Sequence, residues 1–194
     1  MTDFEILEHI VKKRRSGKVA FFNGQKIEDE KVNQLLQLAD WAPTHGHTEP
    51  WRFVVYAGEA VKKFGIDHAE LYKATTTEEQ FNKATYDKLQ HNGDLASHLI
   101  AVYMKRGENP KIPALEEVAA TAAAVENILL GGEALGISIL WSTGGMILKE
   151  PMKKYFSLTE EDTMLGLLYL GYVDHPVKEG KRIVPLEQKV KWVR

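Results

Sequence analysis

Residues 113–145 read PALEEVAATAAAVENILLGGEALGISILWSTGG, and this stretch decides the fold. Its first part, from Pro113 to Leu135, is predicted to be a helix. Pro113 suits the first turn, and the two glutamates that follow complement the positive N-terminal end of a helix. Alanines cover nearly every side of this helix, and small side chains let neighbouring backbones approach closely. We therefore expect it to be buried on several sides.

The second part of the stretch is a strand followed by a turn. Gly136 breaks the helix, and the apolar residues from Ile137 to Trp141 predict the strand. Two hydroxyls, Ser142 and Thr143, and two glycines follow at its carboxyl end. Hydroxyls, free backbone N–H groups and glycines suit a flat heterocycle with polar edges. A tight strand-to-helix turn with a packing tryptophan explains the same residues equally well.

Helices and strands alternate loosely along the rest of the chain. Helical spacing predicts helices at residues 28–42, 59–73, 77–92 and 151–156, and apolar runs predict strands at 51–56, 98–104 and 164–173. Thr77 followed by Gln80 is a candidate capping box. The pattern predicts one layered domain over residues 1–194, of class α+β or α/β.

The composition excludes several classes of protein. A hydrophobic share of 44% is enough for a core, and a formal net charge of −2 gives no basic excess for binding nucleic acid. The absence of cysteine excludes disulfides, thiolate zinc sites, iron–sulfur clusters and a cysteine nucleophile. No signal peptide and no membrane-spanning run is evident, so we expect a cytoplasmic protein without a membrane partner.

A first helix, capped by Thr2 or Asp3 and stopped near Gly17, carries Arg14, Arg15 and Ser16 at its end. Basic residues in a last helical turn complement the negative end of the helix dipole, which explains the arginines taken alone. The alternative is an anion site in which guanidinium groups and a hydroxyl hold a phosphate.

A second basic pair, Lys181-Arg182, lies in the tail, where solvated charges are the simplest interpretation. His45 and His47 lie in a loop between two prolines, which is a common way to hold ligand contacts. No third or fourth ligand accompanies the two histidines, so we expect no metal site. The motifs of Rossmann, P-loop and α/β-hydrolase proteins are absent from the sequence.

Taken in order, these motifs resemble the FMN-dependent nitroreductase family, in particular its compact single-domain members. The resemblance covers nearly the whole chain. Each motif is short, but their order and spacing together make a specific signal. The matching segments are Arg14-Arg15-Ser16, Ala42-Pro43, Pro50-Trp51, the alanine-rich helix with residues 136–145, Gly166 to Tyr172, and a basic tail that contains proline.

The resemblance implies an α+β fold with a mixed, mainly antiparallel central sheet flanked by helices. It implies a domain-swapped homodimer with one FMN per subunit at the dimer interface. A hydride would pass from NADH or NADPH through the flavin to a flat acceptor, such as a nitroaromatic or a quinone, by a ping-pong mechanism. No side chain need act as acid or base in this chemistry, so we expect no catalytic residue.

The same resemblance implies which residues bind the cofactor. Arg14, Arg15 and Ser16 would hold the phosphate or the flavin edge, and Arg182 would reach the phosphate from the tail. Trp41 and His45 would contact the flavin of the other subunit. The positions that would line the ring and phosphate are Trp141, Ser142 and Thr143.

The sequence departs from the family pattern at three positions. Glu49 stands where many members have glutamine, Lys18 where many have arginine, and Trp41 where arginine is frequent in close relatives. The acceptor and the choice between NADH and NADPH therefore stay open. Two other interpretations also stay open: a flavin-binding protein with a flavin-modifying, dehalogenating or regulatory role, and a non-enzymatic anion-binding domain.

The alanine-rich helix and the tail also predict a dimer from their apolar residues. The helix is too uniformly small and apolar to face water, and an identical helix across a two-fold axis would cover it. Residues 174–194 form an extension whose Val184, Leu186, Val190, Trp192 and Val193 need apolar surface. We expect this extension to embrace the other subunit, with a total interface above roughly 2,000 Å². The alternative is a tail folded back on its own core.

Overall fold

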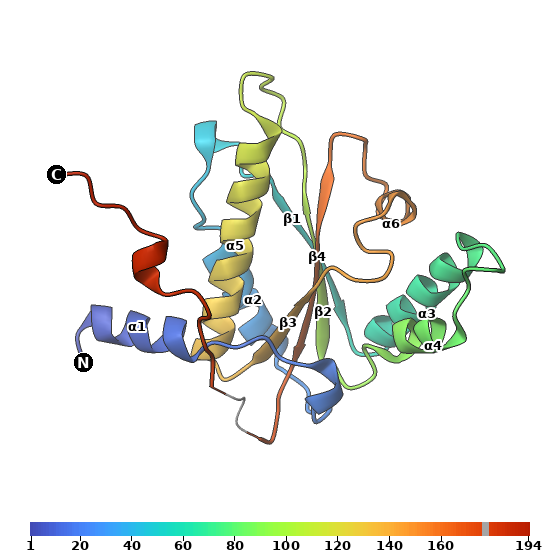
Figure 1. Cartoon of the computed structure of the whole chain (residues 1–194). Helices are drawn as coiled ribbons and strands as arrows, with labels where there is room; N and C mark the ends of the chain where they lie inside the picture. The colour runs from blue at the N-terminus through green and yellow to red at the C-terminus, as the bar shows by residue number, and fades with distance from the viewer. Residues whose placement is uncertain (176–178) are drawn as a thin grey trace.

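A four-stranded sheet forms the centre of the molecule. The computed structural model describes residues 1–175 and 179–194 (Figure 1). The strand order is β1-β2-β4-β3, so that β1 and β3 are the two edges, and each neighbouring pair is antiparallel. The strands are β1 (Trp51–Ala57), β2 (His98–Met104), β3 (Ser138–Ser142) and β4 (Thr163–Gly171). The expected α+β class with a mainly antiparallel sheet is confirmed.

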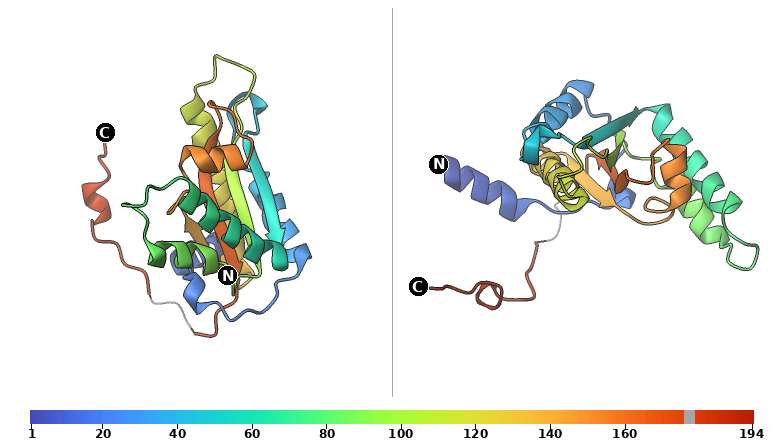
Figure 2. Two further views of the ribbon diagram at one scale, coloured as in Figure 1. Left: turned by 90° about the vertical axis from the view of Figure 1, so that its right-hand side faces the viewer. Right: turned by 90° about the horizontal axis from the view of Figure 1, so that it is seen from above.

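Each face of the sheet carries its own hydrophobic core, because successive side chains of a strand point to opposite faces. On one face, Ile100 and Val102 of β2 pack against the helices α2 (Asp29–Ala39) and α5 (Ala114–Ala134). On the other face, Leu99 and Ala101 pack with residues of α3 (Glu59–Ala74) and α6 (Glu150–Tyr155), and α4 (Lys83–His91) lies against α3 (Figure 2). The side chains of β4 are apolar and buried on both faces of the sheet. Its continuous apolar sequence predicts a strand that is covered on both faces.

The first helix, α1 (Asp3–Lys13), ends earlier than the sequence predicts. It has the full capping box, in which the Thr2 hydroxyl accepts from the Glu5 N–H at 3.2 Å. Arg14 already has an extended backbone, and Gly17 donates its N–H to the carbonyl of Ile139 at 2.9 Å. The prediction of a helix that stops near Gly17 is therefore wrong, because pairing with the edge of β3 outweighs another helical turn.

The predicted capping box at Thr77 is also wrong. α4 begins only at Lys83, and Asn82 caps it by accepting from the Thr85 N–H at 3.1 Å. The preceding segment is held in a turn by α3, since the rings of Phe81 and Tyr72 stack with their centroids 5.7 Å apart. A contact with a neighbouring helix thus delays the start of α4.

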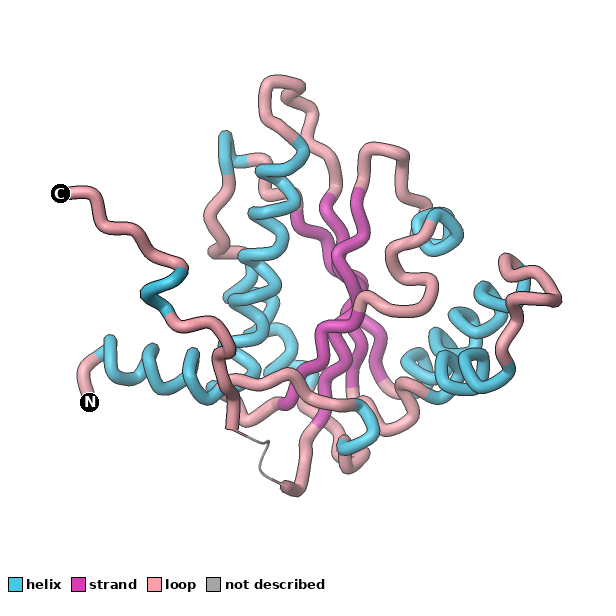
Figure 3. The backbone as a smooth tube through the Cα atoms, viewed as in Figure 1, coloured by secondary structure: helices cyan, strands magenta, loops and turns pink. Residues whose placement is uncertain are grey.

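Two segments extend from the body of the domain (Figures 1 and 3). α1 buries none of its side chains, and residues 179–194 are exposed throughout, including the short η3 turn (Leu186–Gln188). The tail is therefore not folded back on its own core. Within the described residues, no helix is both long enough and apolar enough to cross a membrane.

Candidate functional site

The segment that carries Arg14, Arg15 and Ser16 lies along the outer edge of β3. Ser16 and Ile139 form an isolated parallel bridge. Beyond this bridge the outer edge of β3 has no strand partner among the described residues. Because a strand rises by about 3.3 Å per residue, Trp141 lies about 7 Å beyond the bridge. Because the bridge is parallel, Ser16 is the residue of the arginine motif nearest to Trp141, and Arg15 lies toward Ser138.

The tail approaches the same place. Gly180 packs so closely against the guanidinium group of Arg15 that a Cβ atom at this position has no room. Between α1 and the tail lies a hollow of about 840 Å³, which is lined by the basic residues Lys12, Lys13, Arg15, Lys181 and Arg182 and by the acidic residues Glu5, Glu8 and Glu179. Arg182 and Arg15 thus line the same hollow.

Arg15 offers a donor that nothing in the described part of the chain uses. Its Nε is buried and has no hydrogen-bond partner there, and the neighbouring Ser138 hydroxyl is in the same state. Arg14 is engaged only loosely, with its Nε 3.8 Å from Glu126 Oε1 of α5. A buried donor without a partner is costly, and an anion bound by guanidinium groups would remove that cost. The donor set therefore fits a phosphate.

Trp141 is fixed by its own sheet. Its indole Nε1 donates to the carbonyl of Leu165 on β4 at 2.9 Å. The ring lies directly against Gly166, whose φ of 147° favours glycine and where a Cβ atom would collide with the indole. After Ser142 the chain leaves the sheet, and Thr143 and Gly144 are exposed. A rigid ring followed by exposed backbone and a hydroxyl suits the binding of a planar molecule with polar edges.

A buried histidine supports the turn that follows. His68 of α3 is only 2% exposed, and its Nε2 accepts from the backbone N–H of Met146 at 3.1 Å. Burial lowers the pKa of His68 from 6.5 to about 4, so the ring is neutral at physiological pH. Nothing in the sequence around His68 indicates this role, because its partner is a backbone amide on a distant segment.

This burial predicts a pH dependence of stability. Between the two pKa values of His68, about 6.5 unfolded and about 4 folded, the unfolded chain binds more protons than the folded one. We therefore expect the free energy of unfolding to fall as the pH is lowered, with a contribution from His68 of about 2 kcal/mol at pH 5. Urea denaturation at several pH values would measure it. His68→Gln should show a shallower loss, and an identical pH profile for both proteins would contradict the prediction.

Trp41 and His45 lie in a different region of the same chain. Trp41 follows α2 and is 87% exposed, while His45 belongs to the short turn η2 (His45–His47). His45 Nδ1 lies 2.6 Å from Oε2 of Glu116, in the first turn of α5. Glu116 precedes Glu126, the neighbour of Arg14, by ten residues, which corresponds to about 15 Å along a helix. The structure does not bring His45 to the arginine motif of its own chain. Trp41 instead lies beside Gly131, Ala134 and Leu135, at the carboxyl end of α5.

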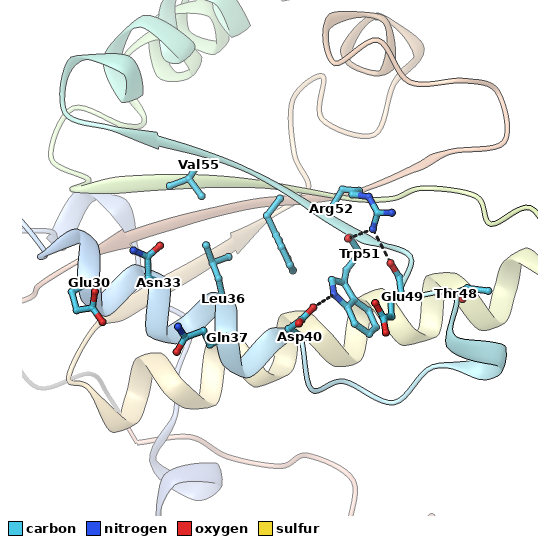
Figure 4. A pocket seen from close by; sticks show the side chains of 11 residues that line it. Glu30, Asn33, Leu36, Gln37, Asp40, Thr48, Glu49, Trp51, Arg52 and Val55 are labelled. Carbon is cyan, nitrogen blue, oxygen red and sulfur yellow. Dashed lines mark hydrogen bonds between the residues drawn. The ribbon is translucent and has the colours of Figure 1, made fainter.

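A groove between α2 and β1 lies beside this loop (Figure 4). Trp51 donates its indole N–H to Asp40 at 3.1 Å, and Arg52 donates to the carbonyl groups of Glu49 and Trp51, each at 2.7 Å. Glu49 lines the groove with a φ of 42°, and His47 has a φ of 53°. Positive φ values in residues other than glycine are strained and gather at functional sites. The loop is therefore a second candidate for ligand contacts, separate from the arginine motif.

The α+β fold, with a hollow between α1 and the tail, defines the class of protein. The sequence model of the nitroreductase family matches residues 11–172. The chain belongs to the nitroreductase family, as its motifs predict. Arg182 lies outside the matched residues, so its assignment depends on the hollow alone.

Individual relatives match over most of their length. The chain is 25% identical over 181 residues to the "Putative NAD(P)H nitroreductase YfhC" of Bacillus subtilis, covering 91% of this chain and 89% of the relative. It is 27% identical over 167 residues to the "Putative NAD(P)H nitroreductase YdjA" of Escherichia coli, covering 86% and 87%. The crystal structure of a nitroreductase-like family protein from Bacillus cereus superposes with a TM-score of 0.80 at 28% identity, covering 100% of this chain and 98% of the other.

Proposed function

We propose that this protein is an FMN-dependent oxidoreductase that transfers a hydride from NADH or NADPH to a flat electron acceptor. The observation that carries the proposal is the buried Nε of Arg15, which has no hydrogen-bond partner among the described residues and belongs to a hollow that Lys13, Lys181 and Arg182 also line. Membership of the nitroreductase family supports it, as do the names of the two relatives, each of which reads "Putative NAD(P)H nitroreductase".

In this proposal Arg14, Arg15, Ser16 and Arg182 hold the phosphate group of FMN. Trp141 and Ser142 line the ring, and Thr143 adds a hydroxyl at its polar edge. When bound, FMN would supply hydride transfer, from the nicotinamide in one half-reaction and to a nitroaromatic, a quinone or a similar acceptor in the other. The side chains bind and orient the reactants, and none of them is assigned a role as acid or base.

The proposed site is shared between two subunits. Trp41 and His45 are exposed in their own chain, and Glu116, the partner of His45, lies ten residues along α5 from Glu126, the neighbour of Arg14. A partner subunit would bring its own Trp41 and His45 over the flavin. The exposed apolar residues of α1 and of the tail provide the surface for this partner, because exposed apolar area of this extent is a usual mark of an interface. We expect a homodimer with a total interface above roughly 2,000 Å².

The colour of the purified protein tests the proposed cofactor. We expect a yellow protein, or one that gains flavin absorbance when FMN is added, and anaerobic bleaching by NADH or NADPH. A colourless protein that does not bind added FMN would contradict the proposal. A flavin that neither nicotinamide bleaches would favour a flavin-modifying, dehalogenating or regulatory role. Stopped-flow reduction with each nicotinamide, followed by reoxidation with a panel of acceptors, identifies the donor and the acceptor class.

Arg14→Ala is expected to weaken FMN binding by about 1.5–3 kcal/mol, the range for a charged hydrogen bond. This corresponds to a rise in Kd of about 10- to 150-fold, measured by fluorescence titration of the apoprotein. Lys63→Ala is the control, since Lys63 is an exposed cation of α3 that is paired with Asp67 at 2.9 Å and does not line the hollow. We expect the control to change Kd by less than about threefold. An unchanged affinity in Arg14→Ala, with a slightly lower Tm, would mean that Arg14 only caps α1.

A further inference from the structure

The turn after β3 is supported from one side only. Thr143, Gly144 and Gly145 are exposed, whereas Met146 and Ile147 are buried in the core between the sheet and α3. A Cβ atom added at Gly144 would meet nothing within 4 Å among the described residues, so this part of the turn faces open space. The position of the exposed residues is therefore set by what lies beneath Gly145 and Met146.

His68 lies beneath the turn. Its Nε2 accepts from the Met146 N–H at 3.1 Å, which joins α3 to a segment 78 residues further along the chain. Gly145, with a φ of 67°, packs directly on the imidazole, and a Cβ atom there would lie 3.0 Å from Nε2 and 2.8 Å from a methyl group of Leu89. The imidazole of His68 and Gly145 are in direct contact, and this contact sets the distance between the turn and α3.

The surroundings of His68 are those of an apolar core. Its ring centroid lies 5.9 Å from that of Phe64, and the same cluster contains Met146, Ile147 and Met152. A buried polar ring costs free energy unless it is hydrogen-bonded, and a leucine or methionine would fill a similar volume without that cost. The imidazole supplies what those residues lack, an acceptor for the buried N–H of Met146. With Nε2 as acceptor, the ring proton lies on Nδ1.

We propose that His68 is a positioning residue of the cofactor site, which holds the turn of residues 143–147 in the shape that receives the flavin ring. The proposal rests on the function proposed above. His68 does not touch the cofactor itself. It acts through the Met146 N–H, and thereby keeps Thr143 and the backbone of Gly144 in place before the ligand arrives. Such preorganisation raises affinity because less ordering is left for the binding step.

The test compares two substitutions of His68. His68→Leu removes the acceptor at similar volume, and we expect a rise of about tenfold in the Kd for FMN, because the Met146 N–H loses its partner. We also expect a shifted flavin midpoint potential and faster hydrogen exchange at the Met146 amide. His68→Gln keeps an acceptor oxygen and is expected to restore most of each property. Val61→Ala, in the same cluster, is the matched control: it should lower Tm but leave the Kd for FMN and the Met146 exchange unchanged.

Each outcome bears on the proposal. If His68→Leu binds FMN with the wild-type Kd and potential while the Met146 amide exchanges faster, the hydrogen bond has no role at the cofactor site and the proposal is wrong. If the wild-type protein itself binds no FMN, the proposed function fails first. If His68→Leu does not fold, Gly145→Ala is the second variant. Gly145 packs on the imidazole of His68, so an added Cβ atom there displaces the turn while His68 itself is unchanged. Gly145→Ala is expected to show the same tenfold loss, and wild-type affinity in that variant would overturn the proposal.

Discussion

A chain that ends at residue 182 is expected to be a monomer that does not retain FMN. The removed residues bury nothing in their own subunit: Ile183 is 87% exposed and Trp192 78% exposed. Several exposed apolar side chains in one short segment indicate a surface that a partner covers. In the proposed dimer the tail embraces the other subunit, and the flavin site needs residues of both chains. Removal of the tail therefore takes away contacts between subunits and, with them, half of each flavin site.

Sedimentation at low micromolar concentration measures the first effect, and flavin absorbance of the purified protein measures the second. The full chain has a mass of 21.9 kDa, so the dimer is expected to sediment as a species of twice that mass. The control is Gln188→Ala in the full-length chain, which changes one exposed polar residue of the tail. This variant should stay dimeric and yellow. A truncated protein that is still dimeric and loaded with flavin would show that the embrace is dispensable.

Much of the fold could be predicted because its elements have strong local patterns. β2 begins at His98 and ends at Met104, as its apolar run predicts, and α5 lies within the predicted bounds. The errors arise where a distant segment competes with local preference. The residues from Arg14 to Gly17 continue a helical pattern, but the edge of β3, more than 120 residues later, holds them in extended form.

The candidate site was predictable where its chemistry is visible in single residues. Arginines, hydroxyls and glycines in their order along the chain lead to the proposed phosphate and ring positions. The structure places Arg15 and Arg182 at one hollow and Ser16 beside Ile139 of β3. The contribution of His68 was not predictable. Its partner is a backbone amide, which every residue type except proline provides, so no sequence pattern records the contact.

Arg106→Leu is expected to lower the free energy of unfolding by about 3–5 kcal/mol, the cost of leaving a buried charge without its partner. The Arg106 guanidinium is paired with the carboxylate of Glu117, which is only 1% exposed, and also donates to the carbonyl of Ile112 at 2.6 Å. Glu117 accepts one more hydrogen bond, from the Gly107 N–H at 3.1 Å, which cannot neutralise its charge. Urea denaturation would measure the loss.

A double-mutant cycle separates the pair from its surroundings. Arg106→Leu with Glu117→Leu removes both charges, so it is expected to cost less than Arg106→Leu alone. Lys12→Ala, which breaks an exposed pair with Glu8, is the control and should cost less than about 1 kcal/mol. A loss below about 1 kcal/mol in Arg106→Leu would contradict a buried pair.

Arg106→Leu is also expected to loosen the loop that contains His45. Glu117 adjoins Glu116, which is the partner of His45, so a disturbed Glu117 should weaken that contact. We expect faster amide exchange at residues 44–49 in Arg106→Leu.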